Sequence, residues 1–390
     1  MKDDKKLELL LERFYQRYNK YNTKVLKKMG EIIKKFDGIT PTVAHQIAQE
    51  LKYGTDIDDL MTELSQLSGK SIKDIEEAFD LVAEENVAFA EVYAKAKNME
   101  FVNYKDNEQL KYLVKAISKE TAEEFINISN TSAVGMTVLN PITNKKVFKP
   151  LKQVYNDLID EAVLNVSTGA KDYQSAMSNI TRQLAQSGVK QINYESGYAR
   201  RVDSSVRQSV LTGVRKVNMQ VQEYIGNQYG ADGVEISAHG DCAEDHLHVQ
   251  GKQYSKKEFE RVNSSLDRPI GEYNCRHFVF RIVLGVNQPS YTRSQLRQLE
   301  QESLSKVEYE GNTYTKYEAT QVQRKLETAI RQQKDNQIIA RASGNKEEVA
   351  KAQQKISQLT QKYNDFSQVA GLDTYKKRLT VSGYKRISVK

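Results

Sequence analysis

The chain has 390 residues, of which 28% are charged and 39% hydrophobic. This length allows two or three domains, and no apolar run is long enough for an ordinary transmembrane helix. Two cysteines are too few for a disulfide scaffold, and Met1–Lys6 leads into an amphipathic pattern rather than a secretory signal, so we expect folding in a reducing cytoplasm. The net charge of +7 does not by itself indicate nucleic-acid binding.

Apolar residues recur at helical spacing through the first 130 residues, beginning with the stretches 7–18 and 25–36. Thr40 and Pro41 predict the start of a short helix. Ser71–Asp74 resembles a capping box and predicts another helix start, followed by a long helical run. These patterns predict a helical scaffold.

Turn-forming residues interrupt this pattern from about Asn127 to Lys146, which predicts a boundary loop or an arm. Helices are expected again after Pro150. A strong helix follows, with a repeating stripe of Val and Ile over 202–225. Basic residues lie at its start and on its other faces, and they indicate either a solvated face or a nucleic-acid surface. They are Arg200, Arg201, Arg207, Arg215 and Lys216.

The remaining two fifths of the chain mix strands and helices. Residues 234–237 and 278–283 predict two strands. Thr292 is expected to cap a helix, and residues 307–314, with Gly311-Asn312 in the middle, predict a hairpin. Two long polar helices are expected over 316–342 and 346–369, paired with each other or with a partner protein. The tail 371–390 has six basic residues and one acidic residue, which suits an anionic surface or disorder; among them are Lys376, Lys377 and Arg378.

The predicted fold is mainly α with a small α+β unit. Long helical N-terminal and C-terminal regions flank a compact, β-hairpin-like core that contains His and Cys. We expect four parts: a helical N-terminal domain (1–130), a linker loop and helical domain (131–230), a compact α+β His/Cys segment (231–291), and a hairpin, two long helices and a basic tail (292–390).

Four of the five histidines and both cysteines lie within 39 residues. Imidazole and thiolate are the ligands that tetrahedral zinc prefers. The spacings His239-x2-Cys242-x3-His246 and Cys275-x-His277 predict two knuckles that close one structural site, with His248 as a further histidine nearby. Six candidates for four places leave the ligand set open. The alternative is that these residues only pack and form hydrogen bonds.

Catalysis by this cluster is a weaker interpretation. A cysteine beside a histidine imitates a thiol protease dyad, but a nucleophile also needs an orienting group and an oxyanion hole in a cleft. The sequence offers neither, and it has no phosphate-binding glycine loop, His-Glu-x-x-His motif or dinucleotide fingerprint. We therefore expect the protein not to be an enzyme.

An ordered string of short motifs resembles the phage minor capsid protein 2 family, a relative of the Mu F-like head morphogenesis proteins of tailed phages. The motifs are Ser237-Ala238-His239, Asp245-His246, Val249–Tyr254, Pro269–His277, Gly285-Val286 and Pro289–Thr292. Val249 stands where the family commonly has Trp, and Cys242 stands where it often has no cysteine. His239, His246, Cys275 and His277 match better and are the preferred ligands of a structural zinc, with Cys242 as the alternative. The related Mu F-like proteins carry a similar Cys/His pattern.

The resemblance implies a structural minor capsid (head) protein of a tailed bacteriophage. Such a protein would dock at the portal vertex and act in head morphogenesis or in genome packaging and ejection. Its expected partners are the portal protein, other capsid proteins and packaged double-stranded DNA, and its expected places are the virion and, during assembly, the host cytoplasm. One alternative is a DNA-binding protein that is packaged or injected with the genome and uses the basic residues named above. A less favoured alternative is a toxin or hydrolase built on the Cys/His cluster.

Overall fold

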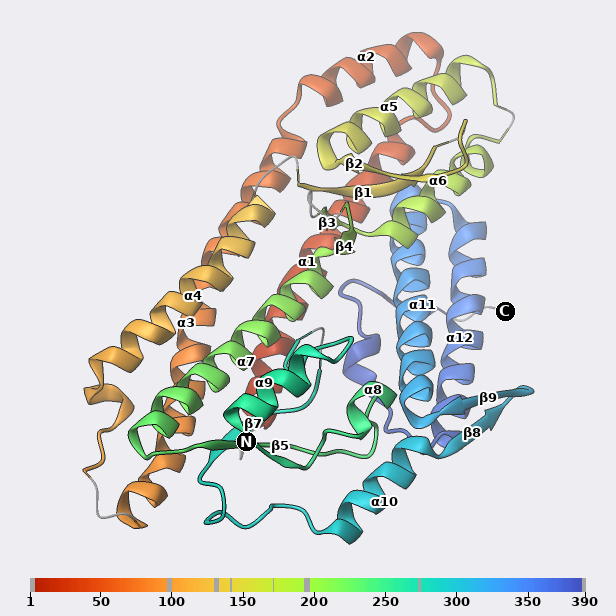
Figure 1. The fold of residues 1–390 in the computed structure, drawn as a ribbon. Helices are drawn as coiled ribbons and strands as arrows, with labels where there is room; N and C mark the ends of the chain where they lie inside the picture. The colour runs from red at the N-terminus through yellow and green to blue at the C-terminus, as the bar shows by residue number, and fades with distance from the viewer. Residues whose placement is uncertain are drawn as a thin grey trace.

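The computed structural model describes residues 4–96, 100–129, 133–140, 142–170, 172–192, 197–272 and 275–387. Over these ranges the chain is mainly helical, with one four-stranded, one three-stranded and one two-stranded sheet (Figure 1). This confirms the predicted fold class, mainly α with a small α+β unit. None of the helices in the described ranges is long and apolar enough to cross a membrane.

Long helices form the body of the molecule, and α3 and α4 pack along α7 on the side opposite α11 and α12 (Figure 1). The first elements are α1 (Asp4–Lys35), α2 (Pro41–Tyr53), α3 (Asp56–Ala96), η1 (Tyr104–Asp106) and α4 (Glu108–Ser129). The predicted start of α2 is confirmed, since Thr40 is its N-cap and Pro41 its first residue. Proline is tolerated there because its missing N–H has no partner in the first turn.

The predicted helix start at Ser71 is wrong, because α3 runs without a break through this position. The Ser71 hydroxyl donates a hydrogen bond to the carbonyl of Leu67, one turn earlier, at 2.8 Å. It also lies 3.3 Å from the hydroxyl of Tyr18 on α1. A serine that bonds to the preceding turn sits inside a helix rather than at its cap. Ser71 is therefore an interior residue of α3 that packs against α1.

The apolar stripe on α7 (Val202–Gln228) is confirmed as a core face. Its valines are buried against the other long helices, which supports β-branched residues in a helix interior. One continuous hydrophobic cluster extends from Leu11 to Tyr229 and includes Ile339. This cluster crosses the expected boundary near residue 130, and the four-part division stays a prediction.

The interruption predicted as a loop or an arm contains a β-hairpin of β1 (Val134–Leu139) and β2 (Lys146–Pro150), with Thr137 opposite Phe148. It joins β3 (Lys190–Ile192) and β4 (Ala199–Arg201) in an antiparallel sheet of order β2-β1-β3-β4. The helices α5 (Leu151–Ser167) and α6 (Tyr173–Ser187) lie between β2 and β3 in the chain. The sequence did not predict these strands.

The compact unit is a three-stranded antiparallel sheet of order β6-β5-β7 with two short helices. Its elements are β5 (Gly233–Ile236), α8 (Glu244–Leu247), β6 (Gln253–Ser255), α9 (Lys256–Ser264) and β7 (Val279–Ile282). The two predicted strands are confirmed as β5 and β7, while β6 was not predicted. A small core of its own, which includes Val234, Val249 and Cys275, holds the unit together.

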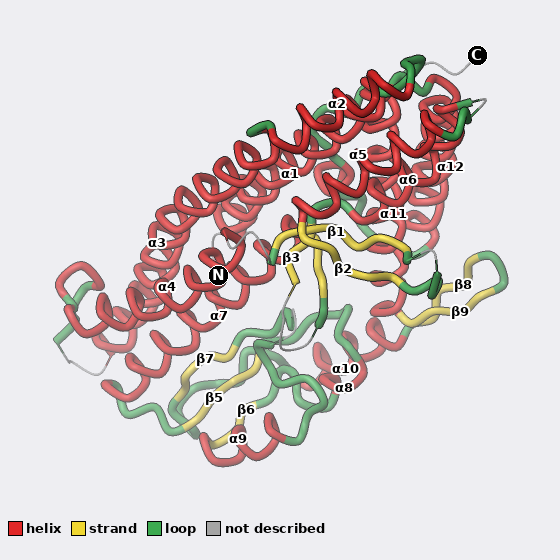
Figure 2. The backbone as a smooth tube through the Cα atoms, turned by 90° about the horizontal axis from the view of Figure 1, so that it is seen from above, coloured by secondary structure: helices red, strands yellow, loops and turns green. Residues whose placement is uncertain are grey.

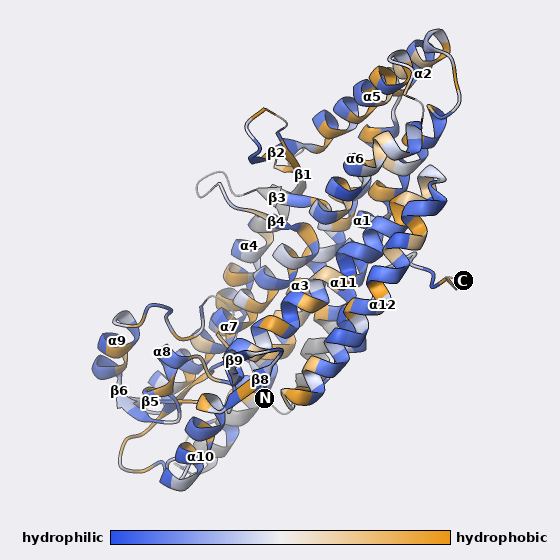
Figure 3. Cartoon of the chain, turned by 90° about the vertical axis from the view of Figure 1, so that its right-hand side faces the viewer, coloured by the Kyte–Doolittle hydropathy of each residue, from blue (hydrophilic) through white to orange (hydrophobic). Residues whose placement is uncertain are grey.

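The C-terminal elements match the prediction closely. Thr292 caps α10 (Arg293–Leu304), and β8 (Lys306–Tyr309) and β9 (Asn312–Thr315) form the hairpin, whose turn is Glu310-Gly311, one residue earlier than expected. The long helices α11 (Lys316–Ser343) and α12 (Lys346–Val369) pack against each other, and α11 also packs against α1 and α6 (Figure 2). Hydrophilic residues predominate along both helices (Figure 3). The tail forms η2 (Lys376–Leu379), which lies on α11.

Candidate metal centre and basic cleft

Strand pairing brings the two His/Cys segments together. Because Ile236 at the end of β5 pairs with Val279 at the start of β7, the residues after β5 and before β7 leave the sheet at the same end. The Ser237 amide donates to the Phe278 carbonyl at 2.9 Å and extends this pairing. His239 and Cys242 follow β5, His246 lies on α8, and Cys275 and His277 precede β7. All of them therefore gather in one region.

Three of the predicted ligands form a buried group. His246, Cys275 and His277 each offer a ligand atom, and these atoms lie within 4.8 Å of one another. The Cys275 Sγ is 3.7 Å from His246 Nδ1 and 3.3 Å from His277 Nδ1. With typical Zn–S and Zn–N bonds, the S···N edge of a tetrahedral site is roughly 3.5 Å. The group therefore has the spacing to hold a metal ion.

The far nitrogen of each buried imidazole faces a hydrogen-bond acceptor. His246 Nε2 lies 2.6 Å from the carbonyl oxygen of Arg268, and His277 Nε2 lies 3.1 Å from Oε1 of Gln250. A proton on each Nε2 would donate to these oxygens and leave each Nδ1 with a free lone pair. Histidine ligands are usually oriented by such outer partners. With the proton on Nε2, His246 and His277 can therefore each bind a metal ion through Nδ1, on the side that faces Cys275.

His239 completes the surroundings of this group. Its ring stacks on that of His277, with centroids 4.4 Å apart and an angle of 31° between the planes. Its Nε2 is buried without a hydrogen-bond partner among the described residues. Its Nδ1 lies 2.8 Å from Oδ1 of Asp241, within ion-pair distance although not aligned as a hydrogen bond. With the three-residue group, His239 lines a cavity of about 120 Å³.

Cys242 and His248 lie outside this arrangement. The Cys242 Sγ is 3.7 Å from Nε2 of His277, on the ring edge away from Cys275, and it donates to the Ala243 carbonyl at 3.3 Å. His248 is exposed. Burial raises the pKa of the Cys242 thiol to about 12. For Cys275, hydrogen bonds from Nδ1 of His246 and His277, which carry protons there when no metal takes their place, outweigh burial and bring the pKa to about 5. Only Cys275 is therefore a thiolate near neutral pH, which is the form that binds metals.

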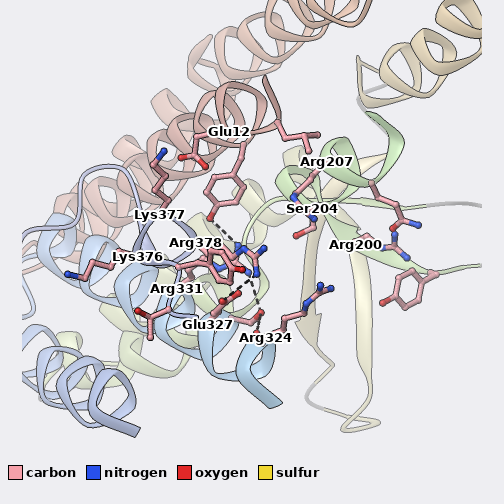
Figure 4. Close-up of a pocket in the computed structure, with 17 residues that line it drawn as sticks. Glu12, Arg200, Ser204, Arg207, Arg324, Glu327, Arg331, Lys376, Lys377 and Arg378 are labelled. Carbon is pink, nitrogen blue, oxygen red and sulfur yellow. Dashed lines mark hydrogen bonds and ion pairs between the residues drawn. The ribbon is translucent and has the colours of Figure 1, made fainter. Parts of the chain in front are cut away.

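A second feature is a cleft of about 920 Å³ between α1, the β4–α7 segment, α11 and the η2 region (Figure 4). Five of the predicted nucleic-acid residues line it, although they come from segments more than 160 residues apart. They are Arg200, Arg207, Lys376, Lys377 and Arg378. The cleft thus unites the two basic segments that the sequence singled out separately.

The other three predicted residues lie elsewhere. The Arg201 side chain is 11% exposed and paired with Asp203 and Asp335, and Arg215 is buried. Neither residue lines the cleft, and their predicted contact with nucleic acid stays a prediction. Lys216 is exposed but pairs with Glu120 of α4, away from the cleft.

Sequence reasoning missed several residues at both features. Arg324 and Arg331 of α11 and Tyr15 of α1 line the cleft. The two arginines are seven residues apart and therefore share a helix face, which is a signal the sequence does contain. At the metal group, Gln250 is part of the Val249–Tyr254 motif, but its contact with His277 depends on the tertiary fold.

Residues 3–368 match the family model described as Phage minor capsid protein 2. The class of the protein is therefore a structural component of a phage capsid. This chain belongs to the Phage minor capsid protein 2 family, which places it in the virion among other phage structural proteins. No curated protein and no solved structure matches the chain.

Proposed function

We propose that this protein docks on the portal protein at one vertex of the phage head, in few copies, and acts in head morphogenesis or in genome packaging and ejection. The observation that carries the proposal is the family match, because it spans both the long helices and the compact unit. The predominance of hydrophilic residues along α11 and α12 supports docking to polar protein surfaces (Figure 3). Assembly from the host cytoplasm is part of this proposal.

Purification of proheads that contain portal protein tests this function. We expect the protein to copurify with them at a fixed ratio to portal, and chemical crosslinking to join the two chains. Proheads assembled without portal protein are the matched control and should lack it. An equal amount in both kinds of prohead would contradict docking at the portal.

We further propose that the compact unit binds one structural zinc ion. His246 Nδ1, His277 Nδ1 and Cys275 Sγ would hold it, with the unpartnered Nε2 of His239 as the fourth ligand. A closed set of four protein ligands is typical of structural zinc. The ion would join the loop after β5, helix α8 and the segment before β7. The apolar core of the compact unit is small, so such a link would stabilise it.

Catalysis by this cluster is not part of the proposal. Its cavity of about 120 Å³ is well below the roughly 300 Å³ at which ligand pockets begin. Cys275 is also buried in the apolar core of the unit. A thiolate in this setting suits a metal better than a polymeric substrate.

A second candidate function is contact with the packaged genome, either in place or as a protein injected with it. The cleft favours this candidate because two predicted basic segments line it together. Contacts with phosphates release counterions, so the affinity for double-stranded DNA should fall steeply with salt. Retention on duplex DNA that does not respond to salt, or no retention at all, would remove this candidate.

A further inference from the structure

The walls of the basic cleft come from four parts of the chain. The β4–α7 segment contributes Arg200 and Arg207 on one side, and Lys376 and Lys377 lie on the other. Arg331 and Arg378 project into the space between them (Figure 4). Because the buried contacts of α1, α7 and α11 fix the walls, the cleft is a built feature of the fold rather than a chance grouping of surface lysines.

The charge of the cleft selects an anion. Seven basic and two acidic side chains line it. One of the acidic residues, Glu327, is buried and lies 3.9 Å from Arg378, which neutralises only a small part of the excess. Within the described chain, Arg324, Lys376 and Lys377 form no ion pair, whereas Arg331 donates to Tyr15 at 3.0 Å and to Thr328 at 3.2 Å. Several cations are therefore available for phosphates.

Two aromatic rings add a second kind of contact. Tyr198 is 61% exposed and Tyr375 is 40% exposed, which is high for such large side chains, and both line the cleft. The guanidinium of Arg200 lies over the Tyr198 ring at 5.1 Å, and that of Arg378 lies over Tyr375 at 4.0 Å. Exposed aromatic rings beside a cationic groove are the usual stacking platforms for bases of single-stranded nucleic acids.

We propose that this cleft binds one unpaired strand of nucleic acid, with phosphates on the arginines and lysines and bases on Tyr198 and Tyr375. The inference rests on the contact with nucleic acid proposed above, at the same cleft, and assigns that contact to an unpaired strand rather than to the packaged duplex. A volume of about 920 Å³ accommodates a few nucleotides of one strand. In a duplex the base faces are already stacked on one another, so the tyrosines would have nothing to bind.

A charge test uses fluorescence anisotropy with a labelled oligothymidine of about 20 nucleotides, which exceeds the usual site size of such clefts. The variant Lys376→Ala/Lys377→Ala removes two cations from the cleft, and Lys115→Ala/Lys119→Ala removes two exposed cations from α4 as the control. Each phosphate contact adds about 0.7 to the slope of log affinity against log salt, so the cleft variant should lose about 1.4. Equal slopes for both variants would overturn the proposal.

An aromatic test separates stacking from charge. Tyr198→Ala/Tyr375→Ala should weaken binding about tenfold or more and leave the salt slope unchanged, because stacking on one ring accounts for about that factor. Tyr112→Ala is the control, since Tyr112 is 77% exposed on α4 and lies outside the cleft. Near-native affinity in the double variant would overturn base stacking. Circular dichroism checks that each variant is folded.

The identity of the anion is tested with three further probes on the full chain. A duplex of the same length, inorganic phosphate and poly-glutamate should each bind more weakly than the single strand. Equal or tighter binding of the duplex or poly-glutamate would overturn the proposal. The copurification experiment with proheads does not depend on these results, so failure here leaves the portal proposal intact, and the reverse also holds.

Discussion

Arg201 and Asp335 form an ion pair of 2.8 Å in the interior, although 134 residues separate them in the chain. Arg201 ends β4, and Asp335 is fully buried on α11. Asn22 of α1 donates to the same carboxylate at 3.3 Å. This contact therefore joins three elements from distant parts of the sequence, and it fixes the position of α11 behind the basic cleft.

Breaking this pair should destabilise the fold strongly. Arg201→Ala leaves the Asp335 carboxylate buried without its cation, and the loss of one partner of a buried pair costs about 3–5 kcal/mol. Urea unfolding measures the change in the free energy of unfolding. The exposed control Lys115→Ala should stay within about 0.5 kcal/mol of the native protein. A similar small effect of Arg201→Ala would show that the pair is dispensable.

The carboxylate of Asp203 gives a pH prediction. Burial raises the pKa of Asp203, but Arg201 and Arg331 outweigh burial and hold that pKa below its ordinary value. Such a group stabilises the fold above its unfolded pKa of about 3.9, and the contribution is lost as the pH falls through the folded pKa. Asp203→Asn should therefore flatten the rise of the unfolding free energy with pH below about pH 4. An unchanged slope would contradict this assignment.

Two helical glycines should respond in opposite ways to alanine. A Cβ at Gly30 of α1 would lie 2.5 Å from Ala342 Cβ and 2.6 Å from the Ile339 carbonyl oxygen, so Gly30→Ala should destabilise the α1–α11 contact by about 1–3 kcal/mol. Gly69 of α3 has no atom within 4 Å of the same position. Gly69→Ala should stabilise by up to about 1 kcal/mol through helix propensity. Thermal denaturation distinguishes the two, and equal shifts would contradict the close approach of α1 and α11.

The two cysteines provide a matched test of the metal centre. We expect elemental analysis to find about one zinc per chain. Cys275→Ser should lose the metal and lower the melting temperature, because metal binding to a structural site stabilises the fold. Cys242→Ser should keep the metal, since Cys242 lies on the other edge of His277.

Two results would contradict the metal proposal. One is a zinc content near zero together with a melting temperature that does not change on addition of a chelator. The other is loss of the metal from Cys242→Ser with retention in Cys275→Ser, which would reverse the assignment of the ligands.

Local patterns predicted the elements whose own residues determine them. Periodicity predicted the helices α11 and α12. Gly344 predicted the break between them, because it adopts a left-handed backbone with φ of 84° at the end of α11. The valine stripe of α7 was read correctly for the same reason. The strands β3 and β4 are only three residues long, so they depend on tertiary pairing, of β3 with β1 and of β4 with β3, and not on any pattern of their own.

The candidate sites were predictable in composition but not in geometry. The His/Cys cluster was visible in the sequence, yet the exclusion of Cys242 depends on which edge of His277 it faces. Likewise, Arg201 ends β4 and Arg207 lies in α7 six residues later, and the ion pair with Asp335 of α11 leaves only 11% of the Arg201 side chain exposed, whereas Arg207 is exposed. Arg200 and Lys376 line the same cleft because of the tertiary fold, which no local sequence pattern indicates.

Quantitative mass spectrometry of purified virions is the sharpest test of docking at the portal vertex. We expect this protein at a constant ratio to the portal protein and far below the major capsid protein. Its absence from virions, or a variable amount unrelated to portal, would contradict a role as a minor capsid protein at the portal vertex.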